Sequence, residues 1–244
     1  MKKIVFVFIA FLSVTAVFAQ DSDKDKKKSD KKKVVNSAGD HIMLQLASDH
    51  WTGMPDSIKG HTTGLSRGAN VYLMMNKPFK NNPQFSAAYG IGIGTSNMYF
   101  KTVNIDVKSN TTTLPFTALD STDRFKKYKL GTTYLEVPVE LRFVKDPSRE
   151  SRSLKGAIGV KLGTILNVHT KGKTLLNKTG SIIDSYTEKV NNKHFFNSTL
   201  LAATGRIGYG NFSLYGSYQI TALLKDGVGP AIHPFEVGIC LSGL

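Results

Sequence analysis

The sequence predicts an all-β protein, an eight-stranded antiparallel β-barrel of the type that crosses a membrane with its strands. Three observations predict it: strict alternation of apolar and polar residues, connections that alternate between long and short, and an export signal at the N-terminus. The alternation is clearest at 134–143, where the odd positions carry Leu135, Val137, Val139, Leu141 and Phe143. A period of two indicates a strand with one apolar and one polar face. About 9–11 residues of a tilted strand cross a bilayer core.

The same alternation recurs in seven further segments, at 40–48, 69–76, 85–94, 154–169, 195–209, 212–221 and 235–242. The connections between the eight segments run long, short, long, short, long, short and intermediate. An even number of strands, with short turns at one end and long loops at the other, is typical of bacterial outer-membrane barrels. Closure of the barrel pairs every backbone donor and acceptor within lipid. A secreted soluble ligand-binding barrel or sandwich is the alternative, but it gives no reason for sorted loop lengths.

The N-terminal region has the organisation of a secretory signal peptide, predicted at residues 1–19. Lys2 and Lys3 precede an apolar run from Ile4 to Val17, and Val17 and Ala19 suit cleavage before Gln20. Residues 20–38 form a predicted disordered arm, because positions 21–33 hold seven lysines and four aspartates and almost nothing apolar. The barrel domain is predicted at 39–244, which places the arm in the periplasm and the protein in the outer membrane.

A hairpin is predicted between 134–143 and the strand that begins at Leu154, turning near Pro147. It sets Glu136 roughly opposite Lys161 on the polar face. Pro138 gives no ladder donor, which indicates a local bulge. In the second strand the even positions carry the face predicted for lipid, namely Leu154, Ile158, Val160, Leu162, Leu166 and Val168. The odd positions, from Lys155 to His169, face the lumen, with Ile165 as an apolar exception.

The strand at 195–209 is predicted to direct Phe195, Leu201, Ala203, Ile207 and Tyr209 towards lipid. On the strand at 85–94, small residues occupy the polar face and leave room for bulky neighbours such as Tyr72 and Arg142. Its string Gly90 to Gly94 lacks the spacing and the following helix of a nucleotide-binding motif.

The polar faces carry seven charged residues that we predict to form a lumen charge network: Glu136, Glu140, Arg142, Lys155, Lys161, Arg206 and Glu236. Such a set fits either an ion path or a salt-bridged plug. An eight-stranded barrel is only wide enough for its own side chains, which favours the plug.

The stretch Tyr134-Leu-Glu-Val-Pro-Val-Glu-Leu-Arg-Phe143 resembles the Tyr-Leu-Glu-Ile-Pro-Leu signature of the PorT-like outer-membrane β-barrel family. The segments 208–218 and 234–238 resemble the closing hairpin of the same family. The resemblance implies an eight-stranded barrel in the outer membrane, and some members of the family serve secretion across the envelope. The opening strand does not match the secretion component itself.

No cofactor, metal site or enzymatic activity is predicted. The six histidines are scattered in the sequence rather than clustered as metal ligands are. His194 and Ser198 share one strand face, which raises the alternative of a lipid-modifying enzyme on the barrel wall. They have no clear carboxylate partner, and there is no Gly-x-Ser-x-Gly motif. The single cysteine, Cys240, excludes an intramolecular disulfide.

The formal net charge is +14, and two of the long loops, predicted at about 103–130 and 171–193, are rich in lysine. The expected partners are outer-membrane lipid and the phosphates of lipopolysaccharide, with an envelope protein docking on the loops as the sharper hypothesis. Nucleic acid is not expected, because no set of stacking aromatic residues accompanies the lysines. The sequence therefore predicts a monomeric barrel with a structural or interaction role at the cell envelope, linked to transport or secretion by the resemblance alone. Three mobile outer loops are expected to display its surface.

Overall fold

The computed structural model describes residues 42–63, 66–120 and 122–243. These residues all belong to the compact unit that spans 37–244. The signal peptide and the charged arm predicted at 1–38 lie outside the described residues. Among the described residues, no helix has the length and hydropathy needed to cross a membrane.

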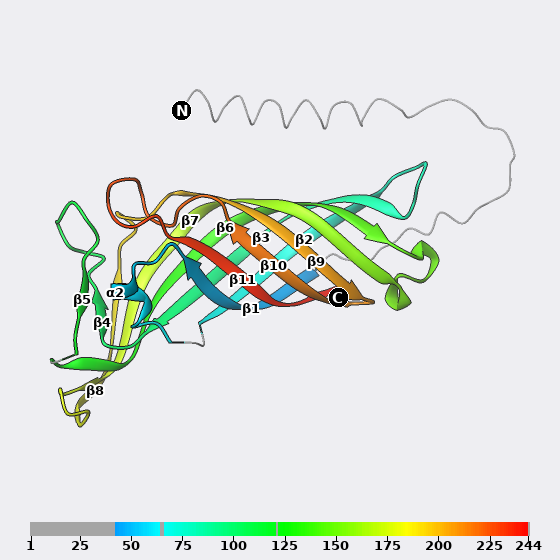
Figure 1. Ribbon diagram of the computed structural model, residues 1–244. Coiled ribbons are helices and arrows are strands. Elements are labelled where there is room, and N and C mark those ends of the chain that lie inside the picture. The colour runs from blue at the N-terminus through cyan, green and yellow to red at the C-terminus, as the bar shows by residue number, and fades with distance from the viewer. Residues whose placement is uncertain (1–41, 64–65, 121, 244) are drawn as a thin grey trace, which may run out of the picture. The chain divides into compact units, whose positions relative to one another are not determined.

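Eight antiparallel strands close into a barrel, which confirms the predicted fold class (Figure 1). They are β1 (Ile42–Thr52), β2 (Arg67–Pro78), β3 (Phe85–Phe100), β6 (Arg124–Val144), β7 (Leu154–Leu176), β9 (Thr199–Tyr209), β10 (Phe212–Gln219) and β11 (His233–Ser242). Each of these eight strands pairs with the next one in this order, including β6 with β7. The pairing of β11 with β1 closes the barrel.

The connections differ at the two ends of the barrel. At one end lie the short turns 79–84, 145–153 and 210–211, of which the second holds the 3₁₀ helix η1 (Pro147–Arg152). At the other end lie the helix α2 (Asp56–Lys59), the hairpin of β4 (Val103–Ile105) and β5 (Phe116–Ala118), and the strand β8 (Ile182–Asn191). Short turns face the periplasm in outer-membrane barrels, so the second end is the extracellular one.

Two of the predicted long loops are wrong in their extent, because each contains strand residues. The loop predicted at 103–130 contains the β4–β5 hairpin and the first residues of β6. The loop predicted at 171–193 is mostly a hairpin in which β8 pairs with the outer part of β7. Strands β6, β7 and β8 therefore continue as a three-stranded sheet, the outer extension, beyond the barrel.

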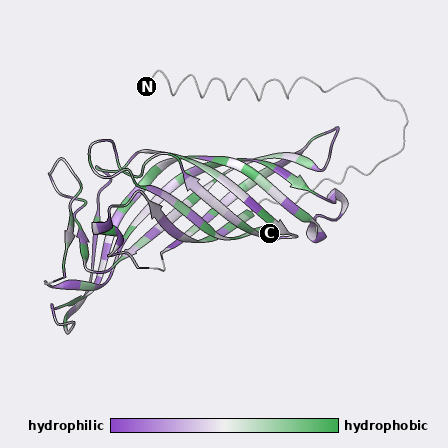
Figure 2. Cartoon of the chain, viewed as in Figure 1, coloured by the Kyte–Doolittle hydropathy of each residue, from purple (hydrophilic) through white to green (hydrophobic). Residues whose placement is uncertain are grey.

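The apolar face of the alternation is the exterior of the barrel. Its wall exposes a belt that includes Ile91, Ile93, Val137, Leu141, Ile158, Val160, Leu214 and Ile239. Hydropathy alternates along the strands accordingly (Figure 2). Apolar side chains that point away from a polar interior are the arrangement of a barrel in lipid and the reverse of a soluble one.

The hairpin of β6 and β7 has a different irregularity from the one predicted. Pro138 does not form a bulge, because it pairs in register with Lys161 on β7. On the β3 side, the pairing passes over Pro138 without a change of register. The bulge lies further out, where Thr133 pairs with Asn167 and Tyr134 with Ile165. Leu166 is the extra residue of β7.

This bulge reverses the parity of β7 beyond Leu166. Val168, predicted to face lipid, is buried in the interior, and His169, predicted to face the lumen, lies on the outer surface. Phe195 was also assigned wrongly to the lipid face. It precedes β9 and is fully buried in the interior.

The interior of the extracellular half is apolar and forms one hydrophobic cluster. Its wall includes Met98, Tyr128, Leu130, Ile165 and Val168. Each outer connection adds buried side chains: Ile58, then Val103, Ile105, Val107 and Leu114, then Phe195 and Phe196, then Leu223, Leu224 and Ile232. The connections therefore pack into a folded cap, in contrast to the mobile loops that were predicted.

Candidate functional site

The middle of the lumen holds an ion cluster centred on Lys161. Its ammonium lies 3.3 Å from Oε2 of Glu136 on β6 and 3.6 Å from Oε2 of Glu236 on β11. Tyr72 donates a hydrogen bond to Glu136, and Tyr215 donates one of 2.9 Å to Glu236. Because β11 and β6 stand on different sides of the ring, these contacts span the lumen.

A second ion cluster lies closer to the short turns. Glu140 accepts a hydrogen bond of 2.9 Å from Nε of Arg142 and one of 3.0 Å from a terminal nitrogen of Arg206. All three side chains are almost completely buried. The seventh charge, Lys155, places its ammonium 3.8 Å from Glu150 in the turn between β6 and β7.

Six of the seven predicted charges therefore form two clusters of three, the seventh, Lys155, lies beside Glu150, and their role stays a prediction. The glycines of β3 leave the space that the first cluster occupies. A Cβ at Gly94 would collide with the carboxylate of Glu136, and one at Gly92 would lie 2.5 Å from the ring of Tyr72. The predicted room for bulky neighbours is present, because Tyr72 stands opposite Gly92 and Arg142 stands opposite Ser86.

Little space remains in the lumen. A cavity of about 30 Å³ lies beside Glu136, Glu236, Tyr134 and Gln219. This volume has room for about two water molecules. Above it the apolar cluster closes the extracellular end, so the described residues leave no wide path through the barrel.

The outward face of the outer extension carries a set of lysines in cross-strand register. Lys129 on β6 stands opposite Lys171 on β7, which stands opposite Lys189 on β8. One row further out, Lys127 stands opposite Lys173. We call this surface, formed by Lys127, Lys129, Lys171, Lys173 and Lys189 with His169, the lysine face.

The lysine face lies above the membrane-spanning part of the barrel, and its charges act on one another. Partial burial, followed by the charges of Lys189, Lys129 and Lys171, lowers the pKa of His169 from its ordinary value of 6.5 to about 4. The pKa of Lys129 is also lowered, first by partial burial and then by Lys171 and Lys189. The face therefore has a strongly positive local potential and a neutral histidine at pH 7.

The inner face of the same extension borders a cavity of about 390 Å³ under the β4–β5 hairpin. Its lining includes Phe125, Tyr128, Asp106, Asp123 and Glu188. The hydroxyl of Tyr128 accepts a hydrogen bond of 3.0 Å from the backbone N–H of Ile105, which fastens the hairpin to β6. On the extension itself, the charged residues that line this cavity are Arg124 of β6 and Glu188 of β8.

The histidines stand in separate places. His50 stacks on Phe235 at a ring distance of 4.9 Å, and His194 packs edge-on against Phe195. Within the described ranges, no group of three or more histidine, cysteine or acidic side chains is arranged to hold a metal ion. In the same ranges, no hydrogen bond joins His194 to Ser198, so the geometry gives the enzymatic alternative no support.

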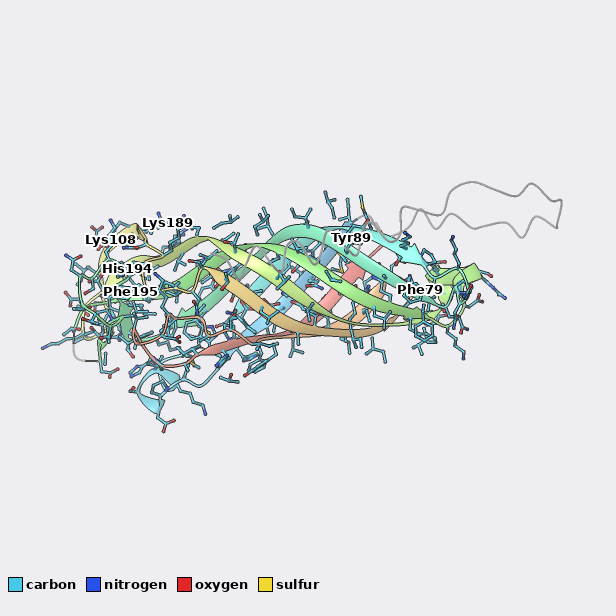
Figure 3. All side chains as sticks on the ribbon, turned by 90° about the horizontal axis from the view of Figure 1, so that it is seen from above. Phe79, Tyr89, Lys108, Lys189, His194 and Phe195 are labelled. Carbon is cyan, nitrogen blue, oxygen red and sulfur yellow. The ribbon has the colours of Figure 1, made fainter. Side chains whose placement is uncertain are left out.

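Sequence reasoning found the inward charges and noticed basic loops, but it missed the lysine face. Lysines at 127, 129, 171 and 173 are spaced by two, which is a strand signal within segments that were assigned to loops. Lys108 and Lys189 gather with His194 and Phe195 at the capped end of the barrel, far from Phe79 (Figure 3).

Comparison with known proteins gives a family. A family model described as an outer membrane protein beta-barrel domain matches residues 18–223. No curated protein matches the chain. Two of the similar solved structures are of Ail, the attachment invasion locus protein of Yersinia pestis, one of them in complex with the heparin analogue sucrose octasulfate.

Both Ail structures share 15% identity with this chain, and each alignment covers 82% of this chain and 95% of Ail. The TM-scores are 0.33 and 0.31. At these values the likeness transfers neither a ligand nor a role.

Proposed function

The chain belongs to the outer membrane protein beta-barrel domain family, and we propose that it acts in the bacterial outer membrane as a closed barrel whose working surface is its folded extracellular cap. The role is one of structure and interaction, with the barrel as a rigid anchor. Transport of solutes through the lumen is not part of it.

The closed lumen carries this proposal. Lys161 bridges Glu136 and Glu236 across the barrel, and the cavity that remains there has a volume of about 30 Å³. Buried ions that lose a partner are costly, so opening a path through this cluster is unfavourable. The apolar cluster at the outer end adds a second obstacle to ions.

The packing of the outer connections supports the cap as the working surface. Phe195, Phe196, Leu223 and Ile232 are buried to 2% exposure or less, although they come from loops. Ordering so many loop residues costs conformational entropy, which their buried apolar contacts offset. A shaped surface of this kind suits a partner in the envelope better than an unstructured loop does.

The resemblance of 134–143 to the PorT-like signature supports a finer proposal, in which the partner belongs to envelope transport or secretion. Lipid modification by the barrel wall has no comparable support. His194 contacts Phe195 and lies on the cap rather than beside a buried nucleophile.

Complementation of a deletion strain tests the proposal. One variant replaces the cap tips, residues 109–113 and 179–181, with glycine and serine, and a matched variant carries Glu236→Gln in the lumen. Both must reach the outer membrane in wild-type amounts. We expect the lumen variant to restore export of secreted proteins and exclusion of a hydrophobic dye, and the cap variant to restore neither. Full complementation by the cap variant together with failure of the lumen variant would contradict the proposal.

A further inference from the structure

We propose that the lysine face binds the phosphate groups of lipopolysaccharide in the leaflet that surrounds the barrel. This inference rests on the proposed interaction role, for which it names one partner. Its evidence is separate, because it comes from the register of β6, β7 and β8 rather than from the lumen.

The register sets like charges side by side. Lys129, Lys171 and Lys189 form one row across three strands, and Lys127 with Lys173 forms the next. Like charges directly opposite one another destabilise a sheet. Neighbouring strands are about 4.8 Å apart, so an unneutralised row of three ammonium groups opposes the folding of the extension.

The face holds no internal counter-charge. Among the described residues, no ion pair joins a carboxylate to any of its five lysines. Lys129 instead donates a hydrogen bond of 2.6 Å to Oδ1 of Asn97 and lies 5.8 Å from the centre of the Tyr99 ring. Glu188, the nearest acidic residue on β8, stands opposite Gly172 and lines the cavity on the inner side. An external anion is therefore the missing partner.

The position of the face selects the source of that anion. Along β6 and β7, the outward-facing residues change from the apolar belt to lysines towards the extracellular end. On β7 the sequence of outward residues is Leu166, Asn167, His169, Lys171 and Lys173. The five residue-to-residue steps of strand from Leu166 to Lys171 span about 16 Å, or about 12 Å along the membrane normal at a tilt of about 45°.

At this height a lysine side chain can bend towards the bilayer and reach the phosphorylated sugars above the acyl chains. The face also continues the outer wall of the barrel, so it looks sideways into the leaflet rather than up into the medium. Lipopolysaccharide phosphates fit both the height of the face above the apolar belt and its sideways orientation. A soluble polyanion would fit the charge but not the direction.

The chemistry suits phosphate. An ammonium is a compact point charge with three donors, and a phosphate oxygen between two adjacent lysines accepts from both. A bound phosphate would remove the repulsion within the row. The lysine face is thus expected to gain stability when lipopolysaccharide is present.

The test compares two triple variants of the full chain in detergent micelles. The first is Lys129→Gln, Lys171→Gln, Lys189→Gln. The control is Lys59→Gln, Lys108→Gln, Lys178→Gln, which removes three exposed lysines from other parts of the cap. Binding is measured with purified lipopolysaccharide, with the same lipopolysaccharide after removal of its phosphates, and with heparin as a soluble polyanion.

We expect the first variant to bind lipopolysaccharide at least tenfold more weakly than wild type, and the control to change less than threefold. Removal of the phosphates from lipopolysaccharide should weaken its binding to the wild-type protein by a similar factor. Without lipopolysaccharide, the first variant should unfold at a higher temperature than wild type, because its like-charge row is gone.

Three results would overturn the inference. They are equal losses in the two triple variants, undiminished binding of dephosphorylated lipopolysaccharide, or tighter binding of heparin than of lipopolysaccharide. Full complementation by the cap-tip variant and failure of the lumen variant, with normal lipopolysaccharide binding, would instead overturn the proposed function alone, since the tips at 109–113 and 179–181 contain no residue of the lysine face.

Discussion

The ammonium of Lys161 lies 3.3 Å from Oε2 of Glu136, although the two residues stand two positions out of register. Glu136 is opposite Gly163, and Lys161 is opposite Pro138. A diagonal pair of this kind is within reach of a long side chain. Gly163 has no Cβ to crowd the side chain of Glu136, and the ammonium also lies 3.6 Å from Glu236, so one cation serves two carboxylates.

Removal of one member of this pair should be costly and removal of both should add little. We expect Glu136→Ala to lower the free energy of unfolding by about 3–5 kcal/mol, because it leaves Lys161 with a weaker set of partners. Adding Lys161→Ala should cost less than about 1 kcal/mol more. Urea unfolding in lipid vesicles measures the cycle, and additive losses would rule out the coupling.

The glycines of β3 should resist substitution according to the side chain that faces them. Gly92→Ala places a Cβ against the ring and backbone of Tyr72, so we expect a loss of about 1–3 kcal/mol. Gly205→Ala on β9 is the matched control, because nothing lies within 4 Å of its Cβ position. Equal unfolding free energies for the two variants would show that the lumen can repack around Tyr72.

His169 should make the stability of the cap depend on pH. Its pKa in the folded protein, about 4, is below its ordinary value of 6.5, because partial burial and the charges of Lys189, Lys129 and Lys171 disfavour the protonated ring. The unfolded chain therefore takes up the proton first, and stability is lost as the pH falls from about 6.5 towards 4. His169→Gln should flatten the unfolding temperature across this window. An unchanged slope in the variant would assign the pH dependence to other groups.

Phe195 should hold the cap together without holding the barrel. Phe195→Ala leaves a large space in the outer apolar cluster, which costs about 3–5 kcal/mol in a well-packed core. We expect faster cleavage by trypsin at the lysines of the cap, with the faster migration of unboiled protein on a gel retained. Ile182→Ala, at an exposed position of β8, is the control and should alter neither. Loss of the mobility shift in Phe195→Ala would mean that cap and barrel unfold together.

The barrel could be predicted because apolar and polar residues alternate without interruption where a strand has lipid on one side and the polar lumen on the other. Glu136, Lys161 and Glu236 fall on the polar parity of their strands, and this placed them inside before any contact was known. The outer half could not be predicted in the same way, because its interior is apolar and parity there no longer separates inside from outside. Ile165 appeared to be an exception on the polar face, yet it is buried as a member of the apolar cluster.

A single bulge accounts for the other errors on β7. One extra residue, Leu166, exchanges the two faces, so Val168 turns inward and His169 outward. No residue type marks this bulge in the sequence. The lysine face remained hidden for the same reason, since its register depends on where β7 resumes pairing with β6.

The closed lumen is the central claim, and conductance across a planar lipid bilayer tests it most directly. The purified protein should insert without producing ion conductance above that of the bare bilayer, whereas a wide porin under the same conditions gives clear steps. Steady open channels in wild type, enlarged by a Glu136→Ala, Lys161→Ala variant, would contradict the account and place the function of the protein in its lumen.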